Sequence, residues 1–146
     1  MEGIIKEKIS ADHLMYVSLK YTKTCDIIVN LLIRWRVMID VSIEKMLKHA
    51  KKRKLISAIP DAPRQKIDKI KELFRKNEDV LKVIEAYEMF REIENLEKQR
   101  ENEFRKNVTL KVAYKGKIIE VNIDKLKEYS EILERFIKEV KHFLSK

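Results

Sequence analysis

Glycine and proline are scarce in this sequence, since each occurs only twice among 146 residues. Both residues interrupt regular helices, so their scarcity predicts long helices. Cysteine occurs once, as Cys25, which excludes an intrachain disulfide and a zinc site built from cysteines. The sequence also has no glycine-rich phosphate loop and no histidine pair at metal-ligand spacing. We therefore expect no cofactor and no metal ion.

A long apolar run is missing as well. The densest apolar stretch, residues 27–43, is interrupted by five polar or charged residues, whereas a membrane span needs about 18 or more apolar residues. The first residues lack the charged and apolar regions of a signal peptide. We therefore expect a cytoplasmic protein with no membrane partner. Hydrophobic residues make up 45% of the chain, which predicts one folded domain over residues 1–146 and not a disordered basic tail.

The net charge of +9 is concentrated in one quarter of the chain. Residues 45–76 carry twelve bases against three acids, while the remainder carries 21 bases and 21 acids. The twelve bases are Lys45, Lys48, Lys51, Lys52, Arg53, Lys54, Arg64, Lys66, Lys69, Lys71, Arg75 and Lys76. A concentrated positive surface attracts phosphate backbones at long range and by counterion release. The segment therefore predicts a non-enzymatic module that binds nucleic acid, with RNA favoured over DNA.

This basic segment has other interpretations. Charged residues form 39% of the chain, which is typical of heat-adapted proteins, in which lysine-rich helix faces serve stability. The segment could also dock on the acidic stretch 78–106, or bind an acidic protein as one subunit of a larger complex. Phe74 is the only aromatic residue within it, which argues against stacking of single-stranded bases.

The overall pattern predicts a mainly α fold, an elongated bundle of four or five helices with one β-hairpin before the C-terminal helix. The first long helical pattern runs from Asp12 to Ile56, with Ser10 or Asp12 as its cap. At 1.5 Å per residue it would be too long for one straight helix in a compact domain, so we expect a break near residues 22–24. The stretch 27–43 is dense enough in apolar residues to be buried on most sides, either at the centre of the bundle or at a subunit interface.

Caps and breakers predict the remaining helices. A turn at Pro60–Pro63 precedes the second helix, with Asp61 as its cap. Asn77 caps a third helix over residues 78–106, and Asp124 caps the last helix, which ends near Leu144.

The hairpin is predicted over about residues 108–123, with Lys115-Gly116 as a two-residue loop. This loop places the apolar residues opposite one another on one face, in the pairs Val112–Ile119, Leu110–Val121 and Val108–Ile123. On the other face, Lys111 opposes Glu120. Because two strands alone are marginally stable, the hairpin must pack on helices or pair with a second copy.

A polar stripe recurs every four residues within the first helical pattern, at Ser18, Thr22, Asp26, Asn30 and Arg34. We expect Asp26, Asn30 and Arg34 to form a buried, hydrogen-bonded network, because buried polar groups must be paired. Alternatively, they line a cleft that binds a ligand or a phosphate.

Arg135 and His142 are separated by six residues on the last helix. This spacing resembles the Arg-x4–6-His signature of HEPN-type ribonucleases, a helical family in which the pair acts on the RNA backbone, usually across a dimer. The resemblance implies a catalytic role for both residues, although Phe136 stands where the family usually has a polar residue. Helical phase places both on the face opposite the apolar stripe.

Residues 18–22 and 103–109 resemble segments of small archaeal helical proteins, a resemblance that implies an origin and no activity. An exposed hairpin edge and the dense 27–43 helix together predict a homodimer.

Overall fold

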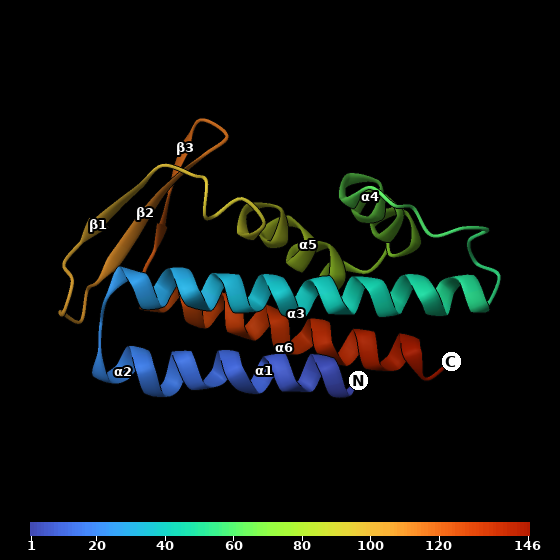
Figure 1. The fold of residues 1–146 in the computed structure, drawn as a ribbon, viewed down its shortest axis with the longest axis horizontal. Helices are drawn as coiled ribbons and strands as arrows, with labels where there is room; N and C mark the ends of the chain where they lie inside the picture. Colours follow the sequence, from blue (N-terminus) through green and yellow to red (C-terminus); the bar gives the residue numbers. More distant parts are fainter.

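The longest helix, α3 (Cys25–Lys52), forms the centre of the fold, which a computed structural model describes over residues 1–146 (Figure 1). Helices α1, α4, α5 and α6 and strand β2 all contact it. Twelve of its 28 residues are buried, so α3 is covered on more than one side. The density of apolar residues over 27–43 predicted this central position, and the structure confirms it.

A helical rod formed by the N-terminal residues lies beside α3 and runs in the opposite direction (Figure 1). The rod consists of α1 (Glu2–His13), the π-helical turn η1 (Leu14–Ser18) and α2 (Leu19–Tyr21). It ends where Thr22 becomes extended, and Thr24 then caps α3 by accepting a hydrogen bond from the backbone N–H of Ile27. The predicted break at residues 22–24 is confirmed.

The predicted start of the first helix at Asp12 is wrong. Ser10 and Asp12 lie inside α1, which begins ten residues earlier, at Glu2. The side chains of Ile4 and Ala11 are buried, and α1 packs along α3. Burial of this apolar stripe extends the helix beyond the local capping signal.

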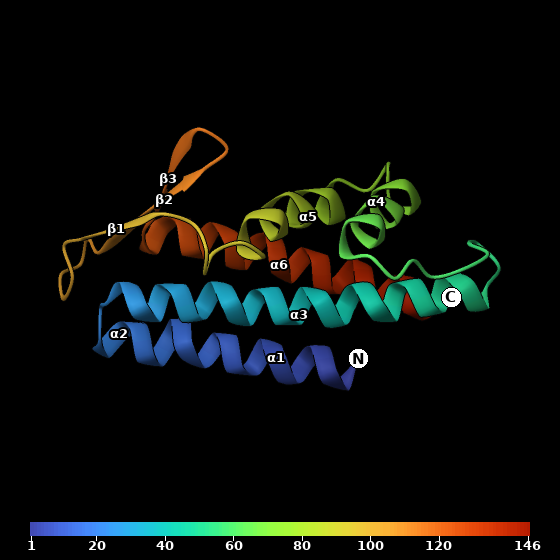
Figure 2. The same cartoon turned by 45° about the horizontal axis from the view of Figure 1, so that its top comes forward.

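Helices α4 (Pro63–Leu73) and α5 (Glu78–Phe90) cover α3 on the side opposite to the rod (Figure 2). The turn before α4 is confirmed, but Asp61 is not its cap. A residue that precedes proline is restricted to extended conformations, so α4 starts at Pro63 and Ala62 occupies the N-cap position. Asn77 caps α5 as predicted, because its Oδ1 accepts a hydrogen bond from the Val80 N–H at 3.2 Å.

The predicted continuation of this helix to Lys106 is wrong, because α5 ends at Phe90 and residues 98–101 form strand β1 (Lys98–Glu101). The Nζ atom of Lys98 donates hydrogen bonds to the carbonyl oxygens of Ile93 and Leu96, at 2.7 and 2.8 Å. These bonds hold the turn after α5. β1 then pairs with β2 in an antiparallel sheet of order β1-β2-β3.

The predicted hairpin is confirmed as β2 (Thr109–Tyr114) and β3 (Lys117–Val121). Leu110 pairs with Val121 and Val112 with Ile119, in the predicted register. Lys115 and Gly116 both have positive φ, as a two-residue type I′ turn requires. The outermost predicted pair, Val108–Ile123, is not formed, because β3 ends at Val121.

The last helix, α6 (Ile123–Leu144), is capped by Asn122 and not by Asp124. Asn122 is extended and its Oδ1 accepts a hydrogen bond from the Lys125 N–H at 2.8 Å. The early end of β3 therefore allows α6 to begin before Asp124, which lies within its first turn.

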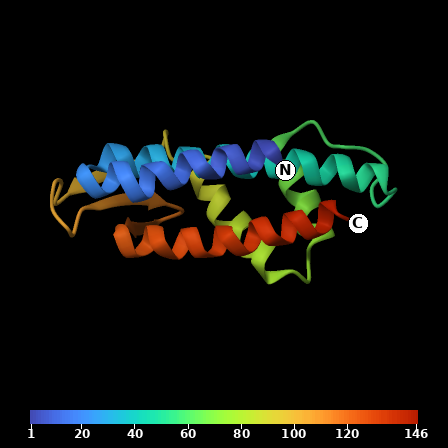
Figure 3. The ribbon, with the colours of Figure 1, turned by 90° about the horizontal axis from the view of Figure 1, so that it is seen from below.

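An aromatic cluster joins α3, α5 and α6 in the core. The ring centroid of Phe90 lies 6.0 Å from that of Trp35 and 5.1 Å from that of Tyr129. Burial raises the pKa of Tyr129 to about 12. Seen from below, α6 runs alongside the rod and α3, so the molecule is elongated along α3 (Figure 3). None of its helices combines the length and the apolar character that crossing a membrane requires.

Candidate nucleic-acid interface

The twelve basic residues predicted from the sequence lie in two groups. The first group, Lys45 to Lys54, occupies the last turns of α3 and the two residues that follow it. This end of α3 extends beyond the N-terminus of α1 (Figure 1). The second group, Arg64 to Lys76, lies on α4 and just after it.

The four basic side chains on α4 itself are paired with acids. Arg64 Nη1 and Lys71 Nζ both bind the Glu88 carboxylate of α5, at 3.2 and 2.6 Å. Lys66 pairs with Glu44 of α3. Lys69 lies 3.5 Å from a carboxylate oxygen of Glu72, one turn away. For this half of the segment, docking on neighbouring acids is therefore the observed arrangement.

Glu88 is the main acceptor of these charges, with its side chain only 13% exposed. Burial raises the pKa of Glu88, but the hydrogen bonds and charges of Lys71 and Arg64 outweigh burial and hold it below its ordinary value. Glu88 therefore stays ionised and neutralises the face of α4 that meets α5.

The other eight bases have no carboxylate oxygen within 4.0 Å of their charged nitrogens. We call these eight residues the α3-end surface: Lys45, Lys48, Lys51, Lys52, Arg53, Lys54, Arg75 and Lys76. All except the half-buried Lys45 are exposed. Their charge is therefore available to an external anion.

A second aromatic cluster joins α3, the C-cap of α4 and α6. Phe143 of α6 packs edge-on against His49 of α3 at 5.3 Å and against Phe74, the C-cap of α4, at 4.9 Å. Arg75 and Lys76 directly follow Phe74 in the turn between α4 and α5, and this turn emerges on the side of α6 away from the end of α3 (Figure 3).

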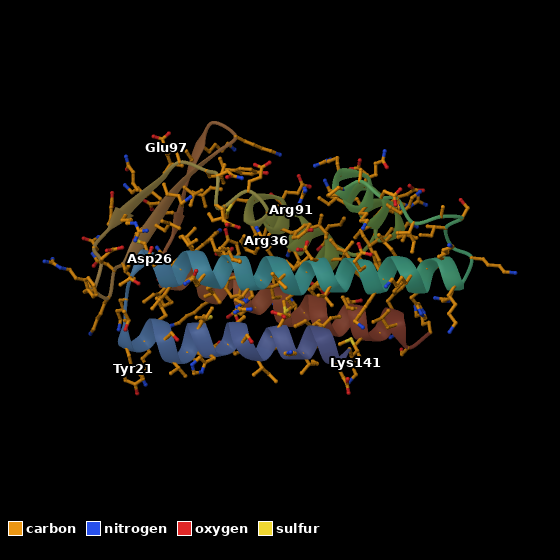
Figure 4. The ribbon with its side chains drawn as sticks, viewed as in Figure 1. Tyr21, Asp26, Arg36, Arg91, Glu97 and Lys141 are labelled. Carbon is orange, nitrogen blue, oxygen red and sulfur yellow. The ribbon has the colours of Figure 1, made fainter.

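Two further lysines near Phe143 were missed in the sequence. Lys141 and Lys146 are exposed and have no carboxylate partner within 4.0 Å. They belong to a segment whose charges balance overall, so composition gave no signal. The C-terminal end of α6 contacts α3 through Phe143 and His49, and the Lys141 side chain lies near the N-terminal end of α1 (Figure 4).

The boundary of the α3-end surface lies at an open pocket of about 420 Å³ next to α4. Lys76 lines it together with Glu78, Asp79 and Glu139. These acids repel phosphate, so the positive surface ends at Lys76.

The polar stripe does not form the predicted buried network, because Asp26, Asn30 and Arg34 are all exposed. Asp26 binds Arg100 of β1, and this hydrogen bond and the charge of Arg100 hold the pKa of Asp26 below its ordinary value. Arg34 lies 3.7 Å from Glu7 of α1. Asp26, Asn30 and Arg34 mark a face of α3 left open between its neighbours, and Asp26 and Arg34 bind separate partners.

Arg135 and His142 are both exposed on α6. The Nε atom of Arg135 lies 3.4 Å from an Asp79 carboxylate oxygen. Two turns of helix, about 10 Å, separate the two residues along the axis. No group of three or more His, Cys, Asp or Glu side chains is arranged to hold a metal ion.

Comparisons of this chain with protein-family models, with curated proteins and with solved structures found no match.

Proposed function

We propose that the protein binds nucleic acid, RNA in the first place, through the α3-end surface and without catalysing a reaction. The observation that supports this proposal is the division of the basic residues. Four are neutralised by acids of the same chain, whereas eight have no such partner, and six of these eight lie on the last turns of α3 and the two residues that follow it. Leaving eight like charges unpaired is unfavourable for the isolated chain and favourable for a chain that meets a polyanion.

The proposed contacts are to phosphates. Lysine acts as a point charge on a flexible stem and suits a backbone whose bases are not read. Phe74, the only aromatic residue in the basic segment, packs against Phe143 and is not free to stack on a base. Binding should therefore be weakly sequence-specific.

The strength of such binding depends on salt. If six phosphates are neutralised on a duplex, affinity should fall by about 10³ between 50 and 200 mM monovalent salt. A protein-docking surface that binds an acidic partner would show no nucleic-acid affinity at physiological salt.

The test is fluorescence anisotropy with labelled single- and double-stranded RNA and DNA, at 50, 150 and 300 mM salt. The variant that reverses Lys51, Lys52 and Lys54 to Glu should lose binding. A matched control reverses Lys106, Lys117 and Lys127, which are also exposed and without a carboxylate partner but lie in the β1–β2 loop, at the start of β3 and in the first turns of α6. This control has the same net charge and should retain most of the affinity.

Absence of binding by the natural protein at 50 mM salt would refute the proposal, as would equal losses in both triple variants. Denaturing gels of the same RNA samples test for cleavage. Cutting that Arg135→Ala or His142→Ala abolishes, with binding retained, would replace the proposal by a ribonuclease.

A further inference from the structure

The outward face of the N-terminal rod is unusually apolar. Nine of its residues are exposed between positions 2 and 21, and we call them the rod face: Glu2, Ile5, Lys6, Ile9, His13, Tyr16, Val17, Lys20 and Tyr21. Five of the nine are aliphatic or aromatic. Tyr21 points away from the helices (Figure 4).

The other helices do not share this composition. Helix α6 also has nine exposed residues, and every one is charged or a histidine. The exposed residues of α3 and α5 are all polar or charged. Since an apolar face on a solvated helix is the exception within this chain, the rod face is suited to contact another surface.

The π-helical turn η1 contributes to this face. Met15 and Leu19 point into the core, while Tyr16 and Val17 between them are both exposed. The π-helical turn therefore carries two adjacent exposed apolar side chains, on the same rod as the exposed Ile5 and Ile9 of α1. Such π turns often occur at functional sites.

We propose that the rod face binds the rod face of a second copy of this chain, with the two rods antiparallel about a two-fold axis near position 11. A two-fold interface must be self-complementary, because the same residues meet their own counterparts. In this register Glu2 lies opposite Lys20 of the partner subunit, and Ile5 lies opposite Val17 of the partner subunit. Near the axis Ile9 lies opposite His13 of the partner subunit, and Tyr16 lies opposite Lys6 of the partner subunit. An ion pair closes each end.

The charges on the rod face support this register. Neither Glu2 nor Lys20 has an oppositely charged side chain within 4.0 Å in its own chain. Asp12, in contrast, is paired with Lys8. The rod face therefore has one unpaired acid, Glu2, and two unpaired bases, Lys6 and Lys20. An antiparallel pair brings Glu2 to Lys20 of the partner subunit at each end and leaves Lys6 without an acidic partner. About 30 Å of helix is available for the contact.

The two features that predicted a homodimer from the sequence do not provide this interface. The apolar side chains of α3 are buried by elements of the same chain. The hairpin is joined by β1, although β1 and β3 remain as sheet edges. The rod face is a different surface, and the α3-end surface remains free when it is covered.

Sedimentation velocity over 1–100 µM protein tests the proposal. The natural chain should sediment as a dimer at the upper concentrations, and Ile9→Lys should raise the dissociation constant by about tenfold or more, because it buries an unpaired charge. Ile118→Lys on β3 is the matched control, since both isoleucines are 64% exposed. The control should leave the dimer intact.

A charge exchange tests the register. Glu2→Lys and Lys20→Glu should each weaken the dimer, and the double variant should restore it. Circular dichroism verifies that each variant is folded, which is expected because all these side chains are exposed. Three results would overturn the proposal: a natural chain that is monomeric at 100 µM, a dimer that Ile9→Lys leaves unchanged, or dissociation by Ile118→Lys alone. Failure of the double variant to restore the dimer would overturn the antiparallel arrangement.

Discussion

The backbone N–H of Leu55 donates a 2.9 Å hydrogen bond to the carbonyl oxygen of Ala50, which closes the end of α3. This bond spans five residues and is the signature of a Schellman motif, whose left-handed position is usually occupied by glycine. Here Lys54 occupies that position, with φ of 62°. A charged residue therefore stands in the α3-end surface at a site where glycine would have the lower energy.

Replacing Lys54 by glycine should stabilise the protein and weaken nucleic-acid binding together. Relief of the left-handed strain should raise the free energy of unfolding by about 1 kcal/mol. Loss of one phosphate contact should reduce the salt slope, the slope of the logarithm of the binding constant against the logarithm of the salt concentration, by about 1. Urea unfolding and anisotropy measure the two effects. Lys54→Ala is the control, because it removes the same charge and keeps the strain. Equal stability of the two variants would contradict the assignment of strain to Lys54.

The division of the basic residues predicts different effects for Lys51→Gln and Lys71→Gln. Lys51 has no carboxylate partner, whereas Lys71 binds Glu88 at 2.6 Å. Lys51→Gln should reduce the salt slope of RNA binding by about 1, and Lys71→Gln should leave it nearly unchanged. Anisotropy titrations at four salt concentrations provide the slopes. Equal reductions would show that α4 takes part in binding despite its ion pairs.

Glu88→Gln should destabilise the protein near neutral pH by about 1 kcal/mol, because it removes the shared acceptor of Arg64, Lys71 and Lys115. Lys71 and Arg64 hold the pKa of Glu88 below its ordinary value. The ionised carboxylate therefore stabilises the fold at pH values above about 4.3, the pKa expected in the unfolded state, and this stabilisation is lost as the pH falls through the lower pKa of the folded state. The difference between natural and variant protein should therefore shrink at acid pH. Urea unfolding at pH 7, 5 and 3 measures it, and a difference that grows with acidity would be inconsistent with the lowered pKa.

The start of α6 predicts unequal effects for two neighbouring polar residues. Asn122→Ala removes the cap that accepts the Lys125 N–H and should cost about 1 kcal/mol. Asp124→Ala removes only a first-turn charge and should cost about 0.5 kcal/mol or less. Thermal unfolding of both variants measures the two losses of stability. A larger loss for Asp124→Ala would assign the cap to that residue.

Phe90→Ala should destabilise the core by 3–5 kcal/mol, estimated roughly from large-to-small substitutions in other cores. The ring packs against both Trp35 and Tyr129. Because Trp35 is the only tryptophan, its emission reports directly on this cluster. A fluorescence-monitored urea titration should show an earlier transition, and an unchanged midpoint would mean that the cluster does not join the three helices.

Local rules predicted the features that depend on neighbouring residues. The register of β2 and β3 follows from one turn and alternating side chains, so it was predicted pair by pair. The break at residues 22–24 and the Asn77 cap were predicted for the same reason. Strand β1 was missed because its residues, Lys98 to Glu101, are charged or polar and suit a helix. Only hydrogen bonding to β2 makes them a strand.

In the candidate site too, neighbouring residues predicted one part and tertiary contacts determined the other. Charge density along the chain located the basic residues, but it could not show which of them are neutralised. That depends on Glu44 and Glu88, which stand on other helices and meet α4 only in the folded chain. The exposure of Asp26, Asn30 and Arg34 is likewise set by the gaps between the elements that surround α3, and a four-residue periodicity carries no information on those gaps.

The opposite directions of the rod and α3 have a geometric result for the proposed dimer. Two antiparallel rods would carry their α3 helices pointing away from one another, with the two basic ends at the far tips of the assembly (Figure 1). A strand bound at one tip could not readily reach the other, so the assembly would connect separate nucleic-acid segments and would not clamp a single one. Mixing at equal stoichiometry should therefore produce large, light-scattering networks with long RNA, and discrete complexes with short oligonucleotides.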